Sequence, residues 1–175
     1  MFGFDGSFEV VPTVYFGKTR EDAKIPAKRY EDAGYDIYAC FDEDFILIPA
    51  HETKMITTGL ISAFSTDYVG ILKERGSTGT QGMAQRAGVI DSGYRGEWLV
   101  PITNTTEKDI VIAKDIPEIK RLAEVRGWTI YPYEKAICQC IFVETPVLLV
   151  KEATVEEIMS IASERKEGRL GSSGK

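Results

Sequence analysis

Short runs of β-branched and aromatic residues, separated by turn-forming residues, make up most of the chain. Proline, glycine and acidic residues mark the ends of these runs, which lie at Phe8 to Phe16, Tyr35 to Cys40, Phe45 to Ile48, Lys54 to Thr57, Leu60 to Phe64 and Tyr68 to Leu72. Closely spaced strands with turn signals between them are typical of a β-sandwich or jelly roll. We therefore expect an all-β fold.

Two stretches depart from this pattern and predict short helices. The first, Pro117 to Arg126, has a proline in its first turn, Gly127 as a stop, and apolar residues at helical spacing: Ile119, Leu122 and Ala123. The second begins at Thr154, where the sequence has the form of a capping box. One face of this second helix is apolar: Val155, Ile158, Met159 and Ala162.

The length, net charge and cysteine content of the chain limit the kinds of molecule that it is expected to bind. A chain of 175 residues fits one domain, and its net charge of −6 argues against a general nucleic-acid or membrane surface. The charge does not argue against a small anion held by local arginines and a divalent cation. An odd number of cysteines, Cys40, Cys138 and Cys140, predicts reduced, buried thiols and a cytoplasmic protein. No apolar run approaches the length of a membrane span, and Met1 to Phe8 does not resemble a signal peptide.

The most informative stretch is Ala87 to Glu97, which predicts a tight hairpin between two short strands. Its turn is Asp91-Ser92-Gly93, where Gly93 accepts a positive φ without penalty. The hairpin presents one carboxylate, Asp91, and one aromatic ring, Tyr94, and the glycines that flank it let a ligand approach the backbone. An ordinary hairpin in which Asp91 caps its own turn explains the same residues.

The segment from Gly88 to Gly96 resembles the third of five motifs in the trimeric deoxyuridine triphosphatases (dUTPases). The other four stand in the family's order at residues 33–39, 70–79, 136–141 and 165–174. The resemblance covers residues 24–175 apart from an insert at residues 115–128, and with that insert we expect a phage-type member. It implies a jelly-roll-like distorted β-barrel as a single domain over residues 1–164, followed by a flexible Gly/Ser-rich lid at residues 165–175 that binds phosphate.

The resemblance also implies an activity: hydrolysis of dUTP to dUMP and pyrophosphate, which limits uracil incorporation into DNA. In this family Mg²⁺ is the cofactor, and a homotrimer shares its active sites between subunits. Asp91 would be the general base that activates water for attack on the α-phosphorus, and Asp36 would hold a water in the shell of the magnesium. The substrate-binding residues that the motifs imply are Arg75, Gly76, Ser77, Gln85, Gly88, Val89, Ile90, Tyr94, Leu99, Gln139, Arg165, Leu170, Ser172 and Ser173.

These residues divide by the part of the nucleotide that they would contact. Tyr94 would lie against the deoxyribose, and backbone groups of residues 88–90 and 99 would pair with the uracil edge and reject cytosine. Arg75, Gln139 and the tail would bind the phosphates. For three of these residues a purely structural explanation is an alternative to substrate binding. Asp36 could cap the Gly34 turn, Arg75 could be solvated in a glycine-rich turn, and Gln139 could pair with a neighbouring loop.

The motifs also depart from the family. The second has Arg-Gly-Ser at residues 75–77 where Arg-Ser-Gly is usual, which leaves the register of the serine open. Ala136 replaces an arginine of the fourth motif, and Leu170 replaces the phenylalanine of the tail that stacks on uracil. The insert at residues 115–128 lies outside all five motifs, and as a hypothesis Ile119, Leu122 and Trp128 give it a docking face for a protein partner.

Two other functions fit part of the pattern. A dCTP deaminase shares the fold and the aspartate hairpin, but its catalytic glutamate stands on the returning strand, where this chain has Pro101, which cannot transfer a proton. A non-catalytic relative that binds a nucleotide or a regulator is compatible with the insert and the motif departures.

Overall fold

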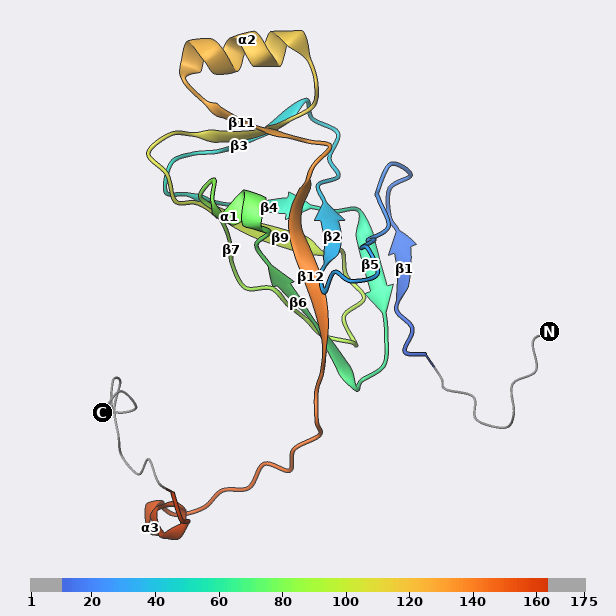
Figure 1. Cartoon of the computed structure of the whole chain (residues 1–175), viewed down its shortest axis with the longest axis vertical. Helices are drawn as coiled ribbons and strands as arrows, with labels where there is room; N and C mark the ends of the chain where they lie inside the picture. Colours follow the sequence, from blue (N-terminus) through green and yellow to red (C-terminus); the bar gives the residue numbers. More distant parts are fainter. Residues whose placement is uncertain (1–10, 164–175) are drawn as a thin grey trace, which may run out of the picture. The chain divides into compact units, whose positions relative to one another are not determined.

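The computed structural model describes residues 11–163, and most of the ordered elements are short strands (Figure 1). The chain divides into two compact units, residues 1–145 and 146–175. The strands of the first unit are β1 (Tyr15–Lys18), β2 (Tyr35–Tyr38), β3 (Phe45–Ile48), β4 (Thr53–Thr57), β5 (Leu60–Ala63), β6 (Tyr68–Lys73), β7 (Met83–Gln85), β8 (Val89–Ile90), β9 (Leu99–Asn104), β10 (Ile110–Ala113), β11 (Thr129–Pro132) and β12 (Ala136–Glu144). Its helices are α1 (Gly76–Gly79) and α2 (Pro117–Arg126).

Within residues 11–163 the strands form four small sheets. Their strand orders are β1-β5, β11-β10-β3, β2-β12-β6-β8 and β4-β9-β7. The predicted all-β, jelly-roll-like class is confirmed, with several short sheets in place of one closed barrel. The longest strand, β12, joins β2 to β6 and therefore forms the centre of the sheet that carries the motifs.

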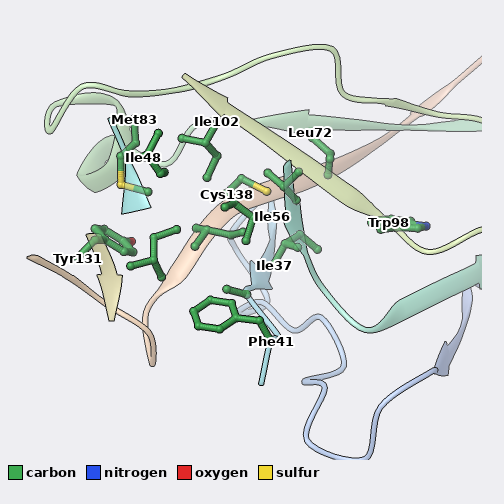
Figure 2. Close-up of a cluster of buried hydrophobic side chains, with 14 of the residues drawn as sticks. Ile37, Phe41, Ile48, Ile56, Leu72, Met83, Trp98, Ile102, Tyr131 and Cys138 are labelled. Carbon is green, nitrogen blue, oxygen red and sulfur yellow. The ribbon is translucent and has the colours of Figure 1, made fainter. Parts of the chain in front are cut away.

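One core lies between these sheets and contains their alternate, inward-facing residues (Figure 2). Its largest fully buried side chains include Trp98 and Tyr131, and each finds a partner for its polar atom. The indole of Trp98 donates to Ser62 Oγ at 3.1 Å, and the Tyr131 hydroxyl donates to the Ala136 carbonyl at 2.6 Å. Both rings are therefore buried without leaving their polar groups unsatisfied.

The three cysteines are free and buried, as the sequence predicts. Desolvation by burial raises the pKa of Cys140 to about 12 and raises the pKa of Cys138 further. These thiols stay protonated and unreactive at neutral pH.

The predicted insert helix is present as α2, and it connects two parallel strands. β10 pairs with β11 in parallel, with Val111 opposite Ile130. A parallel pair needs a crossover connection, and α2 provides it. The helix ends at Gly127, whose φ of 69° allows the left-handed cap.

The apolar residues of the insert face the chain's own sheet. Ile119 and Ala123 are buried beside Val111 and Ala113, and Trp128 packs against this cluster, with its ring 5.7 Å from that of Phe45. α2 lies over the sheet of β11 and β3 in Figure 1. The docking face expected from Ile119, Leu122 and Trp128 is therefore not available, because Ile119 and Trp128 pack on strands of the same unit and Leu122 is half-buried.

The second unit contains α3 (Val155–Ser160), and its predicted capping box is formed. Glu157 N donates to Thr154 Oγ1 at 3.1 Å, and Thr154 N donates to Glu157 Oε2 at 2.7 Å. The helix ends at Ser160, so Ala162 lies outside it. The predicted boundary between domain and lid at residue 164 stays a prediction. No helix within residues 11–163 is long and apolar enough to cross a membrane.

Candidate functional site

Four of the five motifs lie on adjacent strands of one sheet. Its order, β2-β12-β6-β8, brings together the first, fourth, second and third motifs, although they are far apart in the sequence. Asp36 on β2 stands opposite Gln139 on β12, and Gln139 stands opposite Lys73 on β6. This register places three motifs in one row across the sheet.

Asp36 and Arg75 form a two-pronged ion pair at the end of this row. Arg75 Nε lies 2.8 Å from Asp36 Oδ1, and Nη2 lies 3.3 Å from Oδ2. About a third of each side chain is exposed, so the pair faces solvent and a ligand can reach it. Asp36 does not cap the Gly34 turn in this arrangement, because its carboxylate is used by the guanidinium.

The turn after β6 sets the direction of Arg75. Arg75 is the N-cap of α1, and the fully buried Thr78 accepts from Arg75 N at 2.9 Å and donates to Arg75 O at 3.1 Å. Ser77 Oγ lies 3.4 Å from Arg75 Nη1, whereas a Cβ at Gly76 would meet no atom within 4 Å. In this register the hydroxyl lies beside the guanidinium, and Gly76 leaves open space in front of the backbone.

Gln139 is held from two sides. Its Nε2 donates to the Glu74 carbonyl at 2.8 Å, and a Cβ at Gly34 would overlap its side-chain amide. Cys138 and Cys140 are buried on the opposite face of β12, in agreement with the predicted alternation. The Gln139 amide oxygen lies beside Gly34, and both residues line the same cavity.

The groups in this row line a cavity of about 800 Å³, which we call the phosphate cavity. Three cations border it, Lys28, Arg29 and Arg75, against two carboxylates, Asp32 and Asp36. The lining therefore carries one net positive charge in a chain whose net charge is −6. An anionic ligand is favoured here by local charge.

The hairpin forms a second hollow of about 260 Å³, which we call the hairpin hollow. It contains most of the predicted groups of the third motif together with residues of β4 and β9: Met55, Ala87, Gly88, Val89, Ile90, Asp91, Tyr94, Leu99 and Pro101. The turn closes through main chain, because Tyr94 N donates to the Asp91 carbonyl at 3.0 Å. The Asp91 carboxylate is exposed and makes no hydrogen bond to any residue from 11 to 163, so it is not the cap of its own turn.

Backbone strain in the hairpin lies before the turn and not within it. Ala87 and Gly88 have φ of 52° and 101°, whereas Gly93 is not among the residues with positive φ. The expectation for Gly93 is therefore wrong, since the turn closes without a left-handed residue there. Gly88 O accepts from Leu72 N at 2.7 Å, which fixes the start of the hairpin to β6.

Among residues 11–163, the two hollows share no lining residue. Ile90 pairs with Gly70, whereas Gln139 pairs with Lys73, three residues further along β6. Three residues correspond to ~10 Å of strand, and from these points the chain continues to Asp91 and to Arg75 in opposite directions. Asp91 and the phosphate cavity of one copy are therefore too far apart to act on one phosphorus atom.

A model of the dUTPase family matches residues 21–124. The chain belongs to the dUTPase family. A curated member, the deoxyuridine 5'-triphosphate nucleotidohydrolase of Leptospira interrogans, is 30% identical over 103 residues, which are 57% of this chain and 70% of the relative. The family assignment makes the chain a dUTP diphosphatase, as its motifs predict.

Solved dUTPases share its fold. A mutant of the dUTPase of Staphylococcus bacteriophage 80alpha with dUpNHpp aligns at a TM-score of 0.72, with 21% identity, over 93% of this chain and 99% of that chain. A mutant dUTPase from phage phi11 of S. aureus, described for its coordination of a structural Mg(II) ion, aligns at 0.62 with 20% identity, over 81% and 96% of the two chains. At these identities the likeness shows the fold alone.

Of the predicted substrate-binding residues, Gln85 lines neither hollow, and the residues of the fifth motif lie outside the described structure. Gln85 is buried behind the hairpin, where its Nε2 donates to the Arg86 carbonyl and a Cβ at Gly88 would meet it at 2.8 Å. The fifth-motif residues lie outside residues 11–163: Arg165, Leu170, Ser172 and Ser173. Pro101, at the position compared with the deaminase glutamate, lines the hairpin hollow.

Sequence reasoning missed residues that hold the motifs in place. Glu74 joins two motifs, since its carbonyl accepts from Gln139 and its carboxylate accepts from Gln85 N at 3.0 Å. The pKa of the Glu74 carboxyl is lowered, mainly because it accepts a hydrogen bond from its own backbone N–H and also because it accepts one from Gln85 N. Arg95 Nη1 donates to the carbonyls of Ser92 at 2.6 Å and Ser62 at 3.2 Å, which ties the turn to β5. The only feature of the sequence that pointed to Arg95 was its position directly after Tyr94 in the third motif.

Proposed function

We propose that this dUTPase hydrolyses dUTP to dUMP and pyrophosphate with Asp91 as the general base. The observation that carries this assignment is the exposed Asp91 carboxylate, which makes no hydrogen bond within residues 11–163 and lines a hollow together with residues 88–90. A carboxylate with no partner is able to accept a proton from water as the water attacks the α-phosphorus.

The hairpin hollow supports selection of a deoxyuridine. Backbone groups of Gly88, Val89 and Ile90 that are not bonded to β6 would pair with the uracil edge, and a cytosine there would leave donors or acceptors unpaired. Tyr94 is held in place because its hydroxyl donates to the Glu97 carbonyl at 3.0 Å. Its ring would then lie against the sugar and exclude a ribose 2′-hydroxyl. Leu99 closes the opposite wall.

The phosphate cavity supports binding of a metal-chelated triphosphate. Arg75, Ser77 and the second N–H of the Gln139 amide, whose first N–H is bonded to the Glu74 carbonyl, would donate to phosphate oxygens. Gly76 leaves room for the phosphates to approach. Within residues 11–163 no cluster of three or more acidic, cysteine or histidine side chains is placed to hold a metal. Asp36, one of the two carboxylates that line this cavity, fits Mg²⁺ held mainly by the substrate and by water, with Asp36 binding one of those waters. Such an ion would offset charge on the phosphates.

The separation of the two hollows supports a homotrimer in which sites are shared. Asp91 of one copy would meet the phosphate cavity of a second, and the tail residues of a third would close the site: Arg165, Leu170, Ser172 and Ser173. Within residues 11–163 of one copy, Asp91 and the phosphate cavity do not come together, so the proposed reaction requires assembly.

A protein partner at the insert is a separate proposal. Because Ile119 and Trp128 cover the chain's own sheet, such a partner would contact the outer side of α2, where Arg121 and Val125 are exposed. Substitution Arg121→Glu would then weaken a complex without changing turnover. A complex that survives this charge reversal would remove the proposal.

Asp91→Asn tests the assignment of the base. We expect kcat for dUTP to fall by about 10³-fold while a non-hydrolysable dUTP analogue binds with unchanged Kd, because the amide keeps the shape of the carboxylate but cannot accept the proton. Release of pyrophosphate and of ammonia is measured separately with dUTP and dCTP. Ammonia from dCTP would indicate a deaminase, and analogue binding without either product from the wild type would indicate a non-catalytic relative.

A further inference from the structure

We propose that Lys28 binds the terminal phosphates of the substrate, a role that none of the five motifs assigns to it. The inference rests on the proposed function, because it names an additional ligand within the phosphate cavity. Lys28 lies in the loop between β1 and β2 and lines this cavity together with Arg75 and Gln139.

The charges of the cavity show why Lys28 differs from its neighbours. Arg29 is committed to Asp32, with Nε 2.8 Å from Oδ2 and Nη2 3.1 Å from Oδ1. Arg75 is committed to Asp36 in the same two-pronged way. Lys28 makes no ion pair with any carboxylate in the described part of the chain, residues 11–163. The net positive charge of the cavity is therefore carried by Lys28.

The ammonium group of Lys28 is held in position before any ligand arrives. Its Nζ donates to the carbonyls of Arg29 at 3.3 Å and Tyr30 at 3.2 Å. It also lies 5.4 Å from the centroid of the Tyr35 ring, within the range of a cation–π contact. An ammonium has three N–H donors, so one remains for a phosphate oxygen.

A second observation explains why this chain needs the charge. Ala136 stands where the fourth motif usually has an arginine, and it is buried at 2% exposure, with its carbonyl accepting from Tyr131. Position 136 delivers no positive charge to the site in this chain. Ala136 is not among the residues that line the phosphate cavity, whereas Lys28 lines it and supplies a positive charge there.

The arrangement also indicates which phosphates Lys28 contacts. The α-phosphorus must lie beside Asp91, at the boundary between the hairpin hollow of one copy and the phosphate cavity of another. The β- and γ-phosphates continue into the cavity, where Lys28 and Arg29 form the border. Lys28 is therefore expected to distinguish dUTP and pyrophosphate from dUMP.

Lys28→Met removes the charge and keeps the length of the side chain. Lys24→Met is the matched control, because Lys24 is in the same loop and also lies over a tyrosine ring, but it pairs with Glu134 and does not line the cavity. Both variants change the net charge equally. We expect Lys28→Met to weaken binding of dUpNHpp and of inorganic pyrophosphate by about tenfold, because one charge-assisted hydrogen bond is lost. Binding of dUMP should be unchanged, and Lys28→Arg should recover most of the affinity.

Two results would overturn the role of Lys28: unchanged pyrophosphate binding in Lys28→Met, or equal losses in Lys28→Met and Lys24→Met. Turnover by the wild type is measured in the same experiment. A wild type that binds dUpNHpp through Lys28 but does not hydrolyse dUTP would refute the proposed function and leave the phosphate subsite intact. A wild type that hydrolyses dUTP while Lys28→Met is indistinguishable from it would refute the subsite alone.

Discussion

Gly88 determines the backbone course of the hairpin that carries the proposed base. Its φ of 101° is rare for a residue with a side chain, and a Cβ there would lie 3.0 Å from the Leu72 carbonyl oxygen. The same Cβ would press on the buried amide of Gln85. The role of Gln85 in this structure is therefore to fill the space behind a glycine, next to the hairpin hollow.

Gly88→Ala is expected to lower the free energy of unfolding by about 2 kcal/mol, from backbone strain together with the close contact to Leu72. Gly93→Ala in the same hairpin is the control, because a Cβ at position 93 would meet no atom within 4 Å and the φ there is not positive. Urea denaturation of both variants measures the difference. Equal midpoints for Gly88→Ala and the wild type would show that the hairpin adapts without strain.

Motif resemblance predicted which side chains would meet, but not what holds them. Asp36, Arg75, Ser77 and Gln139 converge on one cavity, and the strand alternation of β12 was readable from its pattern. Glu74 and Arg95 were not predicted, because they act on backbone carbonyls and amides of residues distant in the sequence. A side chain that bonds to a backbone group can have any residue type as its partner, so the bond cannot be predicted from the residue types in a single sequence.

At the scale of elements, α2 is a structural part of the sheet it crosses. It buries Ile119 and Ala123 against β10, and it makes the parallel pairing of β10 with β11 sterically feasible. Proline, spacing and Gly127 were enough to predict the helix and its bounds. The parallel pairing was not predictable, since it depends on which strand β11 joins after the helix.

Ile119→Ala should destabilise the protein by about 2–4 kcal/mol, because it leaves a cavity between α2 and the sheet. Val125→Ala in the same helix is the control, since Val125 is 85% exposed and its truncation should change stability by less than about 0.5 kcal/mol. Thermal unfolding followed by circular dichroism compares the two. A similar melting temperature for both variants would mean that α2 contributes no packing energy to the fold.

At the scale of the whole molecule, the proposed base and the phosphate cavity lie toward opposite ends of the paired strands β6 and β8. The family assignment and the motif order predicted both groups, but only the strand register shows that they do not meet within one copy. A single sequence carries no record of the distance between these two ends. The shared site of the proposed trimer follows from that distance.

Complementation between two inactive variants tests sharing directly. Asp91→Asn lacks the base and Arg75→Ala lacks a phosphate ligand, so each variant alone should be inactive. If every site takes Asp91 and Arg75 from different copies, co-expression at equal levels should restore about a quarter of the sites by random assembly. Turnover of dUTP by the mixed, purified protein measures this. Activity no higher than that of either variant alone would place both groups in the same subunit.

The ion pair of Asp36 and Arg75 has a consequence for the choice among anions. Before a nucleotide binds, the Asp36 carboxylate and the Arg75 guanidinium neutralise each other. A ligand that separates them must therefore compensate both charges. Phosphate or sulfate without a bound cation would pair with the Arg75 guanidinium but would leave the Asp36 carboxylate without a positive partner. In the proposed site, a nucleotide that brings its own cation would compensate both side chains. The ion pair would therefore favour metal-chelated triphosphates over simple anions.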